Sequence, residues 1–224
     1  MRRLSTVLCT SGLAAEAKIA RAAGFPVVIG AGDRERTAGL VESAVKQANC
    51  LMSFGIAGAL APWLRPGDVV ISAHVVTESH VWRADEWFQR RVADLAEEIG
   101  AVRGPVFGAP AILATEREKS RAWRNSGALA VDLESDVVAR IASQAGVPFL
   151  VARTIADTLY RELPPAALIP LSEAGTPDLA RVLGSVIRRP RQIGTLIRLA
   201  LETRMALLAL TGPAHALRGL VTTL

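Results

Sequence analysis

The sequence predicts an α/β protein built on a mixed, largely parallel sheet. Short apolar runs of strand length alternate along the chain with segments that have helical periodicity. Helices between such runs allow the crossover connections that parallel strands require. Half of the 224 residues are hydrophobic, so a full core can form without disulfides or bound metal.

Six apolar runs are the expected strands, and they span residues 4–10, 26–30, 50–55, 69–73, 128–131 and 147–153. Helices are expected at residues 14–23 and 134–145. In the second helix Val137, Val138, Ile141 and Ala145 recur at helical spacing. One face of that helix is therefore expected to pack on the sheet.

The C-terminal part of the chain is expected to be helical. Residues 161–170 contain three prolines and predict a loop rather than a domain linker, so the whole chain, residues 1–224, is expected to be one domain. From about residue 175 to residue 224 we expect a basic amphipathic tail, with Arg191, Arg198 and Glu202 projecting from its polar side. Its apolar stripe consists of Leu196, Ile197, Ala200, Leu201, Leu207 and Leu208.

The net charge of +5 is concentrated in this tail. Residues 181–224 carry seven arginines and one acidic residue, Glu202. A basic amphipathic helix suits an anionic membrane surface, and docking on the core or on a dimer partner is the alternative. The tail has no recognisable nucleic-acid motif and no interleaved aromatic residues, so no nucleic-acid partner is expected.

Two further features bear on location. Cys9 and Cys50 lie inside apolar runs and are expected to be small buried hydrophobic residues, which fits a cytoplasmic protein. The uncharged run at residues 47–64 contains glycines, a proline and amide side chains, so it is a poor membrane-spanning helix. We therefore expect a cytoplasmic protein that binds a membrane, if at all, peripherally on its inner face.

Three acidic residues are candidates for chemistry because they lie near the ends of expected core strands. They are Glu16, Glu134 and Asp157. Open α/β sheets bind ligands at strand ends. Carboxyl groups there can donate a proton to a leaving group or stabilise a developing cation, which are two requirements for breaking a glycosidic bond.

Three motifs carry a family resemblance. Residues 53–72, SFGIAGALAPWLRPGDVVIS, resemble the glycine-rich signature of 5′-methylthioadenosine/S-adenosylhomocysteine nucleosidases and their phosphorylase relatives. Residues 130–135, AVDLES, resemble the ribose-binding strand end of that superfamily. Residues 147–157, VPFLVARTIAD, resemble its strand that ends in a base-protonating aspartate. The resemblance implies a three-layer αβα phosphorylase-type fold and cleavage of a purine nucleoside.

The resemblance also implies roles for individual residues. Glu134 would accept hydrogen bonds from the ribose hydroxyls, with Leu133 beside the sugar, and Asp157 would protonate N7 of the purine. A carboxylate that holds the hydroxyls stabilises positive charge on the sugar, and an acid at N7 lets the base leave neutral. The structural alternatives are a helix N-terminal carboxylate for Glu134 and a loop cap for Asp157.

Further site residues follow from the same resemblance. Glu16 matches the glutamate that orients the attacking water in the nucleosidases, with an exposed helix glutamate as the alternative. Ile112 and Leu113 fall where the family holds the purine, although core packing would explain them as well. The substrate-binding segment of the glycine-rich signature corresponds to Gly55, Ile56 and Ala57.

Phosphate is the expected co-substrate of a phosphorolysis, and no other cofactor and no metal are expected. The family often has a hydroxyl residue in the glycine-rich segment to contact phosphate or water, whereas this chain has Ile56. Only Gly12, Arg34 and Arg36 remain as candidate phosphate contacts. A pair of exposed turn arginines is the alternative explanation for Arg34 and Arg36.

A more specific resemblance concerns the substrate. The tail segment VIRRPRQIGTLIRLA at residues 186–200, GLAAEA at residues 12–17 and LPPA at residues 163–166 resemble hopanoid-associated phosphorylases, which remove adenine from adenosylhopane. The resemblance makes phosphorolysis of adenosylhopane, with release of adenine in hopanoid biosynthesis, the leading expectation for the function. Such a lipid-linked nucleoside would lie in a bacterial membrane. The basic tail would then approach anionic lipid, and Trp82, Trp87 and Phe88 would cover the 5′ pocket, touch lipid, or pack under a lid or across a dimer.

Two other functions stay open from the sequence. One is a soluble methylthioadenosine or S-adenosylhomocysteine hydrolase, which Glu16 and the missing hydroxyl favour. The other is a non-catalytic nucleoside-binding protein that kept the fold. The resemblance further implies a homo-oligomer.

Overall fold

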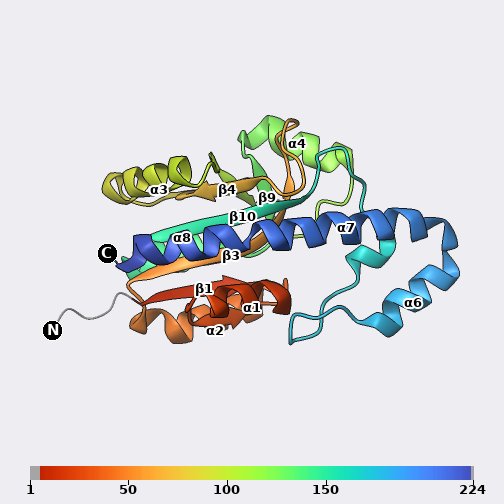
Figure 1. Ribbon diagram of the computed structural model, residues 1–224, viewed down its shortest axis with the longest axis horizontal. Coiled ribbons are helices and arrows are strands. Elements are labelled where there is room, and N and C mark those ends of the chain that lie inside the picture. The colour runs from red at the N-terminus through yellow and green to blue at the C-terminus, as the bar shows by residue number, and fades with distance from the viewer. Residues whose placement is uncertain (1–5, 223–224) are drawn as a thin grey trace.

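The computed structural model describes residues 6–222, with side chains described to residue 219, and its centre is one mixed sheet (Figure 1). The strand order is β6-β5-β8-β9-β3-β10-β4-β7, and β1 and β2 extend the sheet from β3. Most pairings are parallel, whereas β10 with β4, β3 with β9 and β5 with β6 are antiparallel. The strands are β1 (Val7–Ser11), β2 (Val27–Ile29), β3 (Cys50–Ala59), β4 (Val69–Ser72), β5 (His74–Val76), β6 (Val81–Arg83), β7 (Val102–Arg103), β8 (Val106–Gly108), β9 (Ala130–Asp132) and β10 (Phe149–Asp157).

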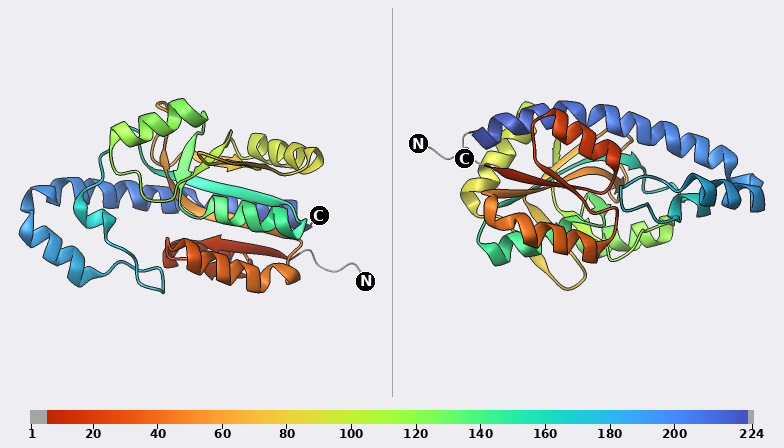
Figure 2. Two further views of the ribbon diagram at one scale, coloured as in Figure 1. Left: turned by 180° about the vertical axis from the view of Figure 1, so that it is seen from behind. Right: turned by 90° about the horizontal axis from the view of Figure 1, so that it is seen from below.

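Helices cover both faces of the sheet, which confirms the three-layer αβα architecture (Figure 2). One face carries α1 (Ala14–Ala22), α3 (Glu86–Glu98), α7 (Ile193–Ala209) and α8 (Thr211–Thr222). The opposite face carries α2 (Arg34–Ala44) and α5 (Ser135–Ala145). Beyond the end of β9 lies α4 (Glu116–Ser126), and α6 (Leu179–Arg188) projects away from the sheet (Figure 1).

The helix starts follow local capping chemistry. The side chain of Asp33 accepts a hydrogen bond from the backbone of Arg36 and so caps α2. Thr115 and Glu118 form a capping box at the start of α4. Gly127 ends that helix in the left-handed conformation. These caps fix where the connecting loops meet the sheet.

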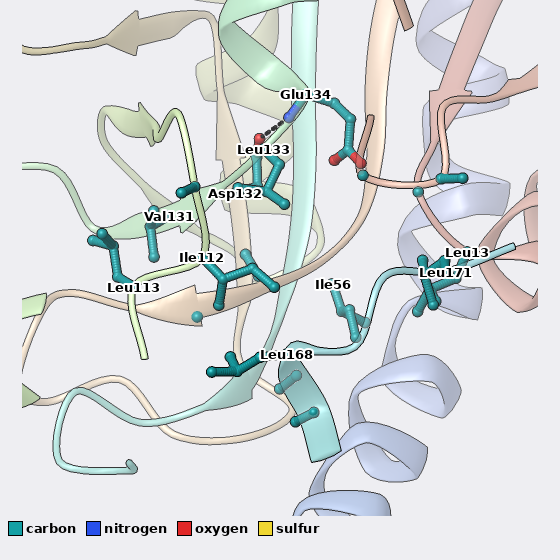
Figure 3. A pocket seen from close by; sticks show the side chains of 18 of the residues that line it. Leu13, Ile56, Ile112, Leu113, Val131, Asp132, Leu133, Glu134, Leu168 and Leu171 are labelled. Atoms are coloured by element: carbon teal, nitrogen blue, oxygen red, sulfur yellow. Dashed lines mark hydrogen bonds between the residues drawn. The ribbon is translucent and has the colours of Figure 1, made fainter. Parts of the chain in front are cut away.

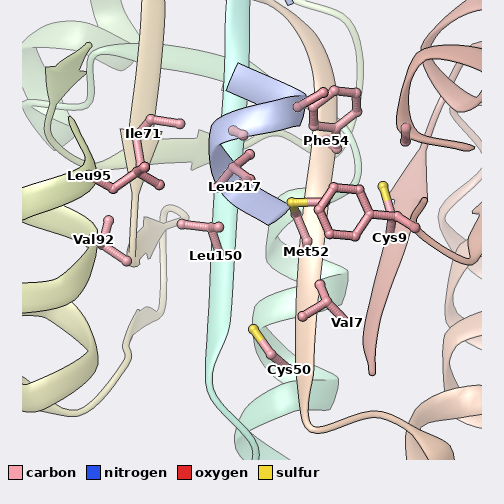
Figure 4. Packing of buried hydrophobic residues seen from close by; sticks show 14 of the residues in the cluster. Val7, Cys9, Cys50, Met52, Phe54, Ile71, Val92, Leu95, Leu150 and Leu217 are labelled. Atoms are coloured by element: carbon pink, nitrogen blue, oxygen red, sulfur yellow. The ribbon is translucent and has the colours of Figure 1, made fainter. Parts of the chain in front are cut away.

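Both cysteines lie in the core, as expected (Figure 4). Cys9 on β1 and Cys50 on β3 are buried, and burial raises the pKa of each thiol to about 12. They pack with Met52, Phe54 and Leu150 under α8. A thiol with such a raised pKa is unreactive at neutral pH and acts as a small hydrophobic group.

The two central strands are longer than the sequence predicts. β3 continues to Ala59 instead of ending at residue 55, and β10 continues to Asp157 instead of residue 153. The two strands pair with each other over nearly their whole length. Four of the residues at positions 55–59 are glycine or alanine, which are depleted in strands, but this parallel pairing keeps the segment extended. The substrate-binding segment of the glycine-rich signature, residues 55–57, is therefore part of the sheet.

Several elements were not predicted, namely the strands β5 to β8 and the helices α2, α3 and α4. The strands among them are three residues long or shorter, too short to show a period. The predicted strand at residues 4–10 begins at Val7 in the described part of the chain, and its first two residues lie outside that part.

The tail is helical, as expected, but its apolar stripe is divided. Ile197, Leu201 and Leu208 of α7 are exposed, whereas Leu196 and Leu207 are half-buried. The prediction that Glu202 projects from the opposite, solvent side is wrong, because Arg161 draws it into a half-buried ion pair. The loop at residues 161–170 is confirmed, apart from the short 3-10 helix η2 (Pro165–Leu168). Within residues 6–222, none of the helices is both long and apolar enough to span a bilayer.

Candidate active site

A pocket of about 670 Å³ opens at one end of the sheet, where β1, β3, β9 and β10 come together (Figure 3). Ten of the predicted site residues line it, and Leu13 of the GLAAEA segment lies beside them: Gly12, Glu16, Arg36, Ile56, Ala57, Ile112, Leu113, Leu133, Glu134 and Asp157. Gly55 and Arg34 do not line it. The topology thus brings together residues that are more than a hundred positions apart in the sequence.

Glu16 lies buried in the first turn of α1, where its carboxylate accepts hydrogen bonds from three backbone N–H groups. Its carboxylate accepts hydrogen bonds from the backbone N–H groups of Gly12 at 2.9 Å, Leu13 at 2.8 Å and Ile56 at 2.8 Å. Burial raises the pKa of the Glu16 carboxyl, and Arg153 opposes that shift. The alternative of an exposed helix glutamate is therefore wrong.

Two glycines make room for the buried carboxylates. A Cβ atom on Gly55 would lie 2.5 Å from the carboxylate of Glu16. A Cβ atom on Gly12 would lie 2.7 Å from Oε1 of Glu134. Both distances are below any normal contact, so a larger residue at either position would displace an acidic side chain. Gly55 therefore leaves room for the carboxylate of Glu16, although it does not itself line the pocket.

Glu134 stands at the N-terminus of α5 without capping that helix with its side chain. Asp132 provides the cap instead, since its Oδ1 accepts hydrogen bonds from the backbone N–H groups of Glu134 at 2.9 Å and Ser135 at 2.7 Å. The Glu134 carboxylate is left to face the pocket, where Figure 3 shows it near Leu133. Burial raises its pKa to about 7, with Arg153 opposing the shift.

A buried arginine links the acidic residues at this end. The guanidinium of Arg153, on β10, lies 2.9 Å from Oδ2 of Asp132 and 3.4 Å from Oε2 of Glu134. It also donates to Oγ of Ser53 at 2.5 Å and to the carbonyl of Ile56 at 3.3 Å. Because Glu16 also acts on it electrostatically, one cation serves three carboxylates.

At the other end of the pocket, Asp157 is paired with a buried lysine. A register shift between Ile155 and Asp157 places Asp157 opposite Gly58 of β3. Lys119 of α4 forms an ion pair with Oδ2 of Asp157 and donates to the carbonyls of Thr158 at 3.0 Å and Arg161 at 2.9 Å. Burial raises the pKa of the Asp157 carboxyl, and the Lys119 ammonium opposes that shift. Asp157 is therefore the last residue of a strand, not a loop cap.

Apolar side chains form the walls between these two ends. Ile112, Leu113 and Leu133 lie on one side, and Leu168 of η2 lies across from them (Figure 3). Ile112 is 41% exposed, so it is a wall residue and not part of the core. Trp82, Trp87 and Phe88 do not line the pocket, because Phe88 is buried in the core and Trp87 lies on the surface beside Arg91.

The two arginines predicted to contact phosphate have different positions. Arg34 is held by Asp136 through bonds of 2.7 and 2.5 Å and by the carbonyls of Ala109 and Leu133, so it is a structural link between α2 and α5. Arg36 lines the pocket, and its ion pair with the exposed Glu173 is 3.5 Å long. Neither is a simple exposed turn arginine, and only Arg36 can reach a ligand.

Three charged residues of the site were not predicted. Arg153 could have been found, because it is a charge inside an apolar run of strand length. Asp132 lies in the AVDLES segment, two residues before Glu134, and the sequence does not show which of the two carboxylates faces a ligand. Lys119 belongs to the charged segment at residues 116–121, which is typical of a solvated helix face, and no sequence signal marks it as buried.

The comparisons with known proteins agree with this architecture. The structure of 5′-methylthioadenosine/S-adenosylhomocysteine nucleosidase from Neisseria meningitidis in complex with methylthio-immucillin-A superimposes with a TM-score of 0.70 and 15% identity, over 99% of this chain and 100% of that chain. The Helicobacter pylori nucleosidase of the same name gives 0.68 and 12%, over 100% of both chains. Futalosine hydrolase of Helicobacter pylori gives 0.63 and 16%, over 83% of this chain and 98% of that chain.

At these identities the likeness concerns the fold. A family model described as the phosphorylase superfamily matches residues 36–188. The match ends before most of the tail and begins after Glu16, and it includes Glu134, Arg153 and Asp157. Because it spans more than half of the sequence, this chain belongs to the phosphorylase superfamily.

Proposed function

We propose that this protein cleaves the N-glycosidic bond of a purine nucleoside and that water is the attacking nucleophile. The observation that carries the proposal is the arrangement of Glu134 and Asp157, which line one pocket with apolar walls between them. That spacing suits a nucleoside lying with its sugar at Glu134 and its base at Asp157. The residue roles extend those implied by the sequence resemblance.

The charge at the sugar end suits a cationic sugar. Glu16, Asp132 and Glu134 surround the single guanidinium of Arg153, so this end holds more negative than positive charge when its carboxyls are ionised. As the glycosidic bond breaks, the ribose ring becomes positively charged. Buried, preorganised carboxylates stabilise such a charge more strongly than water does. Glu134 would also accept hydrogen bonds from the ribose hydroxyls.

The base end suits proton donation. Burial raises the pKa of Asp157, so its carboxyl holds a proton more readily than an ordinary aspartate does. Transfer of that proton to N7 makes the purine a neutral leaving group. Apolar side chains such as Ile112 and Leu113 provide surfaces on which a flat base can lie.

Water is favoured over phosphate because Glu16 already fills the local anion-binding position. The backbone N–H groups of Gly12 and Leu13 donate to one oxygen of the Glu16 carboxylate and that of Ile56 donates to the other, an arrangement of donors that would also suit the oxygens of a phosphate. The carboxylate of Glu16 accepts all three. A phosphate anion there would meet the negative charge of Glu16 without those donors, whereas a water molecule could give its proton to the same carboxylate.

The test measures adenine release from 5′-methylthioadenosine in ¹⁸O-labelled water. The reaction is run without inorganic phosphate and then over a 10-fold range of phosphate concentration. We expect full activity in phosphate-free buffer, with ¹⁸O in the free sugar. Glu16→Gln is expected to lower kcat by about 100-fold, and Glu42→Gln, at an exposed position of α2, serves as the control. An absolute requirement for phosphate, with a sugar phosphate as product, would show that the enzyme is a phosphorylase.

Phosphorolysis of a lipid-linked adenine nucleoside such as adenosylhopane is the second candidate. It is favoured by Arg36, which lines the pocket. Within residues 6–222 its one ion pair is a 3.5 Å contact with the exposed Glu173, so its guanidinium is available to a phosphate. The apolar segment at residues 167–171, which forms part of the pocket wall, suits a large hydrocarbon 5′ group. Incubation with adenosylhopane and labelled phosphate tests it, since the label must appear in the sugar product and the Arg36→Met variant must lose this incorporation.

A further inference from the structure

The helix α6 presents an unpaired apolar face to solvent. Leu179, Leu183 and Ile187 follow one another at intervals of four residues and therefore lie on one side of the helix. Their exposed fractions are 76%, 60% and 71%, and none of the residues of α6 is buried. A stripe of large aliphatic side chains on a projecting helix is unfavourable in water and indicates a contact surface.

Arginines border this stripe at the end of the helix. Arg188, Arg189 and Arg191 are exposed and lie in or directly after the last turn of α6. A hollow of about 250 Å³ beside them is lined by Pro165, Ser185, Arg188 and Arg189. The single acidic residue between positions 181 and 224, Glu202, is paired with Arg161 and does not neutralise them.

The helix is attached firmly to the loop that forms one wall of the pocket. Gln192, at the start of α7, donates to the carbonyl of Ser185 at 2.9 Å and to its Oγ at 3.1 Å. Its Oε1 accepts the backbone N–H of Ala166 in η2 at 3.0 Å. Neighbouring residues of η2, Ala167 and Leu168, line the catalytic pocket. The apolar stripe is thus held at a fixed position near the mouth of the pocket.

We propose that α6 is a membrane-docking element that binds an anionic lipid bilayer, with its aliphatic stripe in the acyl region and Arg188, Arg189 and Arg191 among the headgroups. The combination of exposed aliphatic side chains with a basic border is what an interfacial helix requires. The inference does not depend on the reaction proposed above. The sequence pattern pointed to the stripe of α7, where Ile197, Leu201 and Leu208 are exposed as well. The basic border at the end of α6 is the observation that assigns the contact to that helix.

A second copy of this chain fits the surface less well. A two-fold contact with the two α6 helices parallel would bring the arginine border of one copy against that of the other. An antiparallel contact would place that border against the start of the other α6, where the carboxylate of Asp178 is already paired with Arg181. Like charges that meet in a contact destabilise it, unless acidic groups separate them. Anionic headgroups complement the same border, and salt screens the attraction between them and the arginines.

The experiment is co-sedimentation of the full chain with vesicles of phosphatidylcholine alone or with 30% phosphatidylglycerol. We expect binding to the anionic vesicles at least 10-fold stronger than to the neutral ones, with a decrease in high salt. The double variant Leu183→Asp, Ile187→Asp is expected to lose at least 10-fold in partitioning. Arg188→Gln and Arg189→Gln are expected to lose about fivefold each.

A matched control uses another exposed apolar pair. Val81 of β6 and Trp87 of α3 are 59% and 51% exposed. The helix α3 lies at the opposite end of the molecule from α6 (Figures 1 and 2). The double variant Val81→Asp, Trp87→Asp should bind vesicles like the unmodified protein. Thermal unfolding checks that each variant is folded.

Two results would overturn the proposal. One is failure of the folded protein to bind anionic vesicles. The other is a change of oligomeric state in the Leu183→Asp, Ile187→Asp variant, measured by light scattering without lipid, while vesicle binding stays unchanged. The second result would assign the stripe to a contact between copies. Neither result bears on nucleoside cleavage, which is measured separately with a water-soluble substrate.

Discussion

The two ends of the pocket differ in their balance of carboxylates and cations. At the sugar end, the carboxylates of Glu16, Asp132 and Glu134 share the guanidinium of Arg153. At the base end, one carboxylate, Asp157, is matched by one ammonium, Lys119. The first arrangement leaves an excess of negative charge for a cationic sugar, whereas the second is a neutral pair that can control the position of a proton. In the proposed function, this difference orients the nucleoside with its sugar at Glu134 and its base at Asp157.

The largest expected effect comes from removing the proposed acid. Asp157→Asn should lower kcat by about 1000-fold, because the amide keeps the shape of the side chain but has no proton of suitable acidity to give to the base. Steady-state adenine release measures the change, and thermal unfolding checks the fold. Unchanged turnover in a folded Asp157→Asn protein would exclude Asp157 as the proton donor. Absence of turnover in the unmodified protein would favour a nucleoside-binding function.

Loss of the partner lysine should have a smaller effect that identifies its role. In Lys119→Met the ammonium no longer opposes the burial of Asp157, so the pKa of that carboxyl rises further. We expect kcat to fall by about 10- to 100-fold and the alkaline limb of its pH profile to move to higher pH.

The control for this prediction is the double variant Lys119→Met, Asp157→Asn. If Lys119 acts through Asp157, adding the lysine change to the aspartate change should have little further effect on kcat. An alkaline limb that stays in place in Lys119→Met would mean that the lysine serves only the carbonyls of Thr158 and Arg161.

The sugar end should determine the acidic limb of activity. Glu134 must be ionised to stabilise the sugar cation, and burial raises its pKa to about 7. Protonation therefore inactivates the free enzyme as the pH falls through this value, and kcat/KM should be about tenfold lower one pH unit below it. The profile of kcat/KM against pH measures this. The residual activity of Glu134→Gln should lack that limb, and a wild-type limb near pH 4 would contradict the role given to Glu134.

The smallest expected effect concerns the apolar wall between the two ends. Ile112→Ala removes a half-exposed side chain that would contact the base in the ground state and the transition state alike. Such a change weakens uniform binding, so KM should rise by about three- to tenfold while kcat stays within a factor of two. A fall in kcat without a change in KM would indicate that Ile112 orients the reacting groups.

Much of the fold could be predicted because its signals are local. Apolar runs such as residues 69–73 and the periodicity of α5 depend only on neighbouring residues, and both agree with the structure. The strand ends could not be predicted in the same way. Residues 55–59 become part of β3 because β10 lies beside them, and that pairing joins segments a hundred residues apart.

For the site, the sequence by itself predicted three acidic residues that line the pocket, because Glu16, Glu134 and Asp157 occur in motifs that can be compared segment by segment. Only the tertiary structure decided their surroundings: that Glu16 fills the backbone donors of Gly12, Leu13 and Ile56, and that Lys119 is buried against Asp157. The physical reason is that a charge in a buried pair is defined by a partner that is distant in sequence. No local pattern distinguishes such a lysine from one on a solvated helix face.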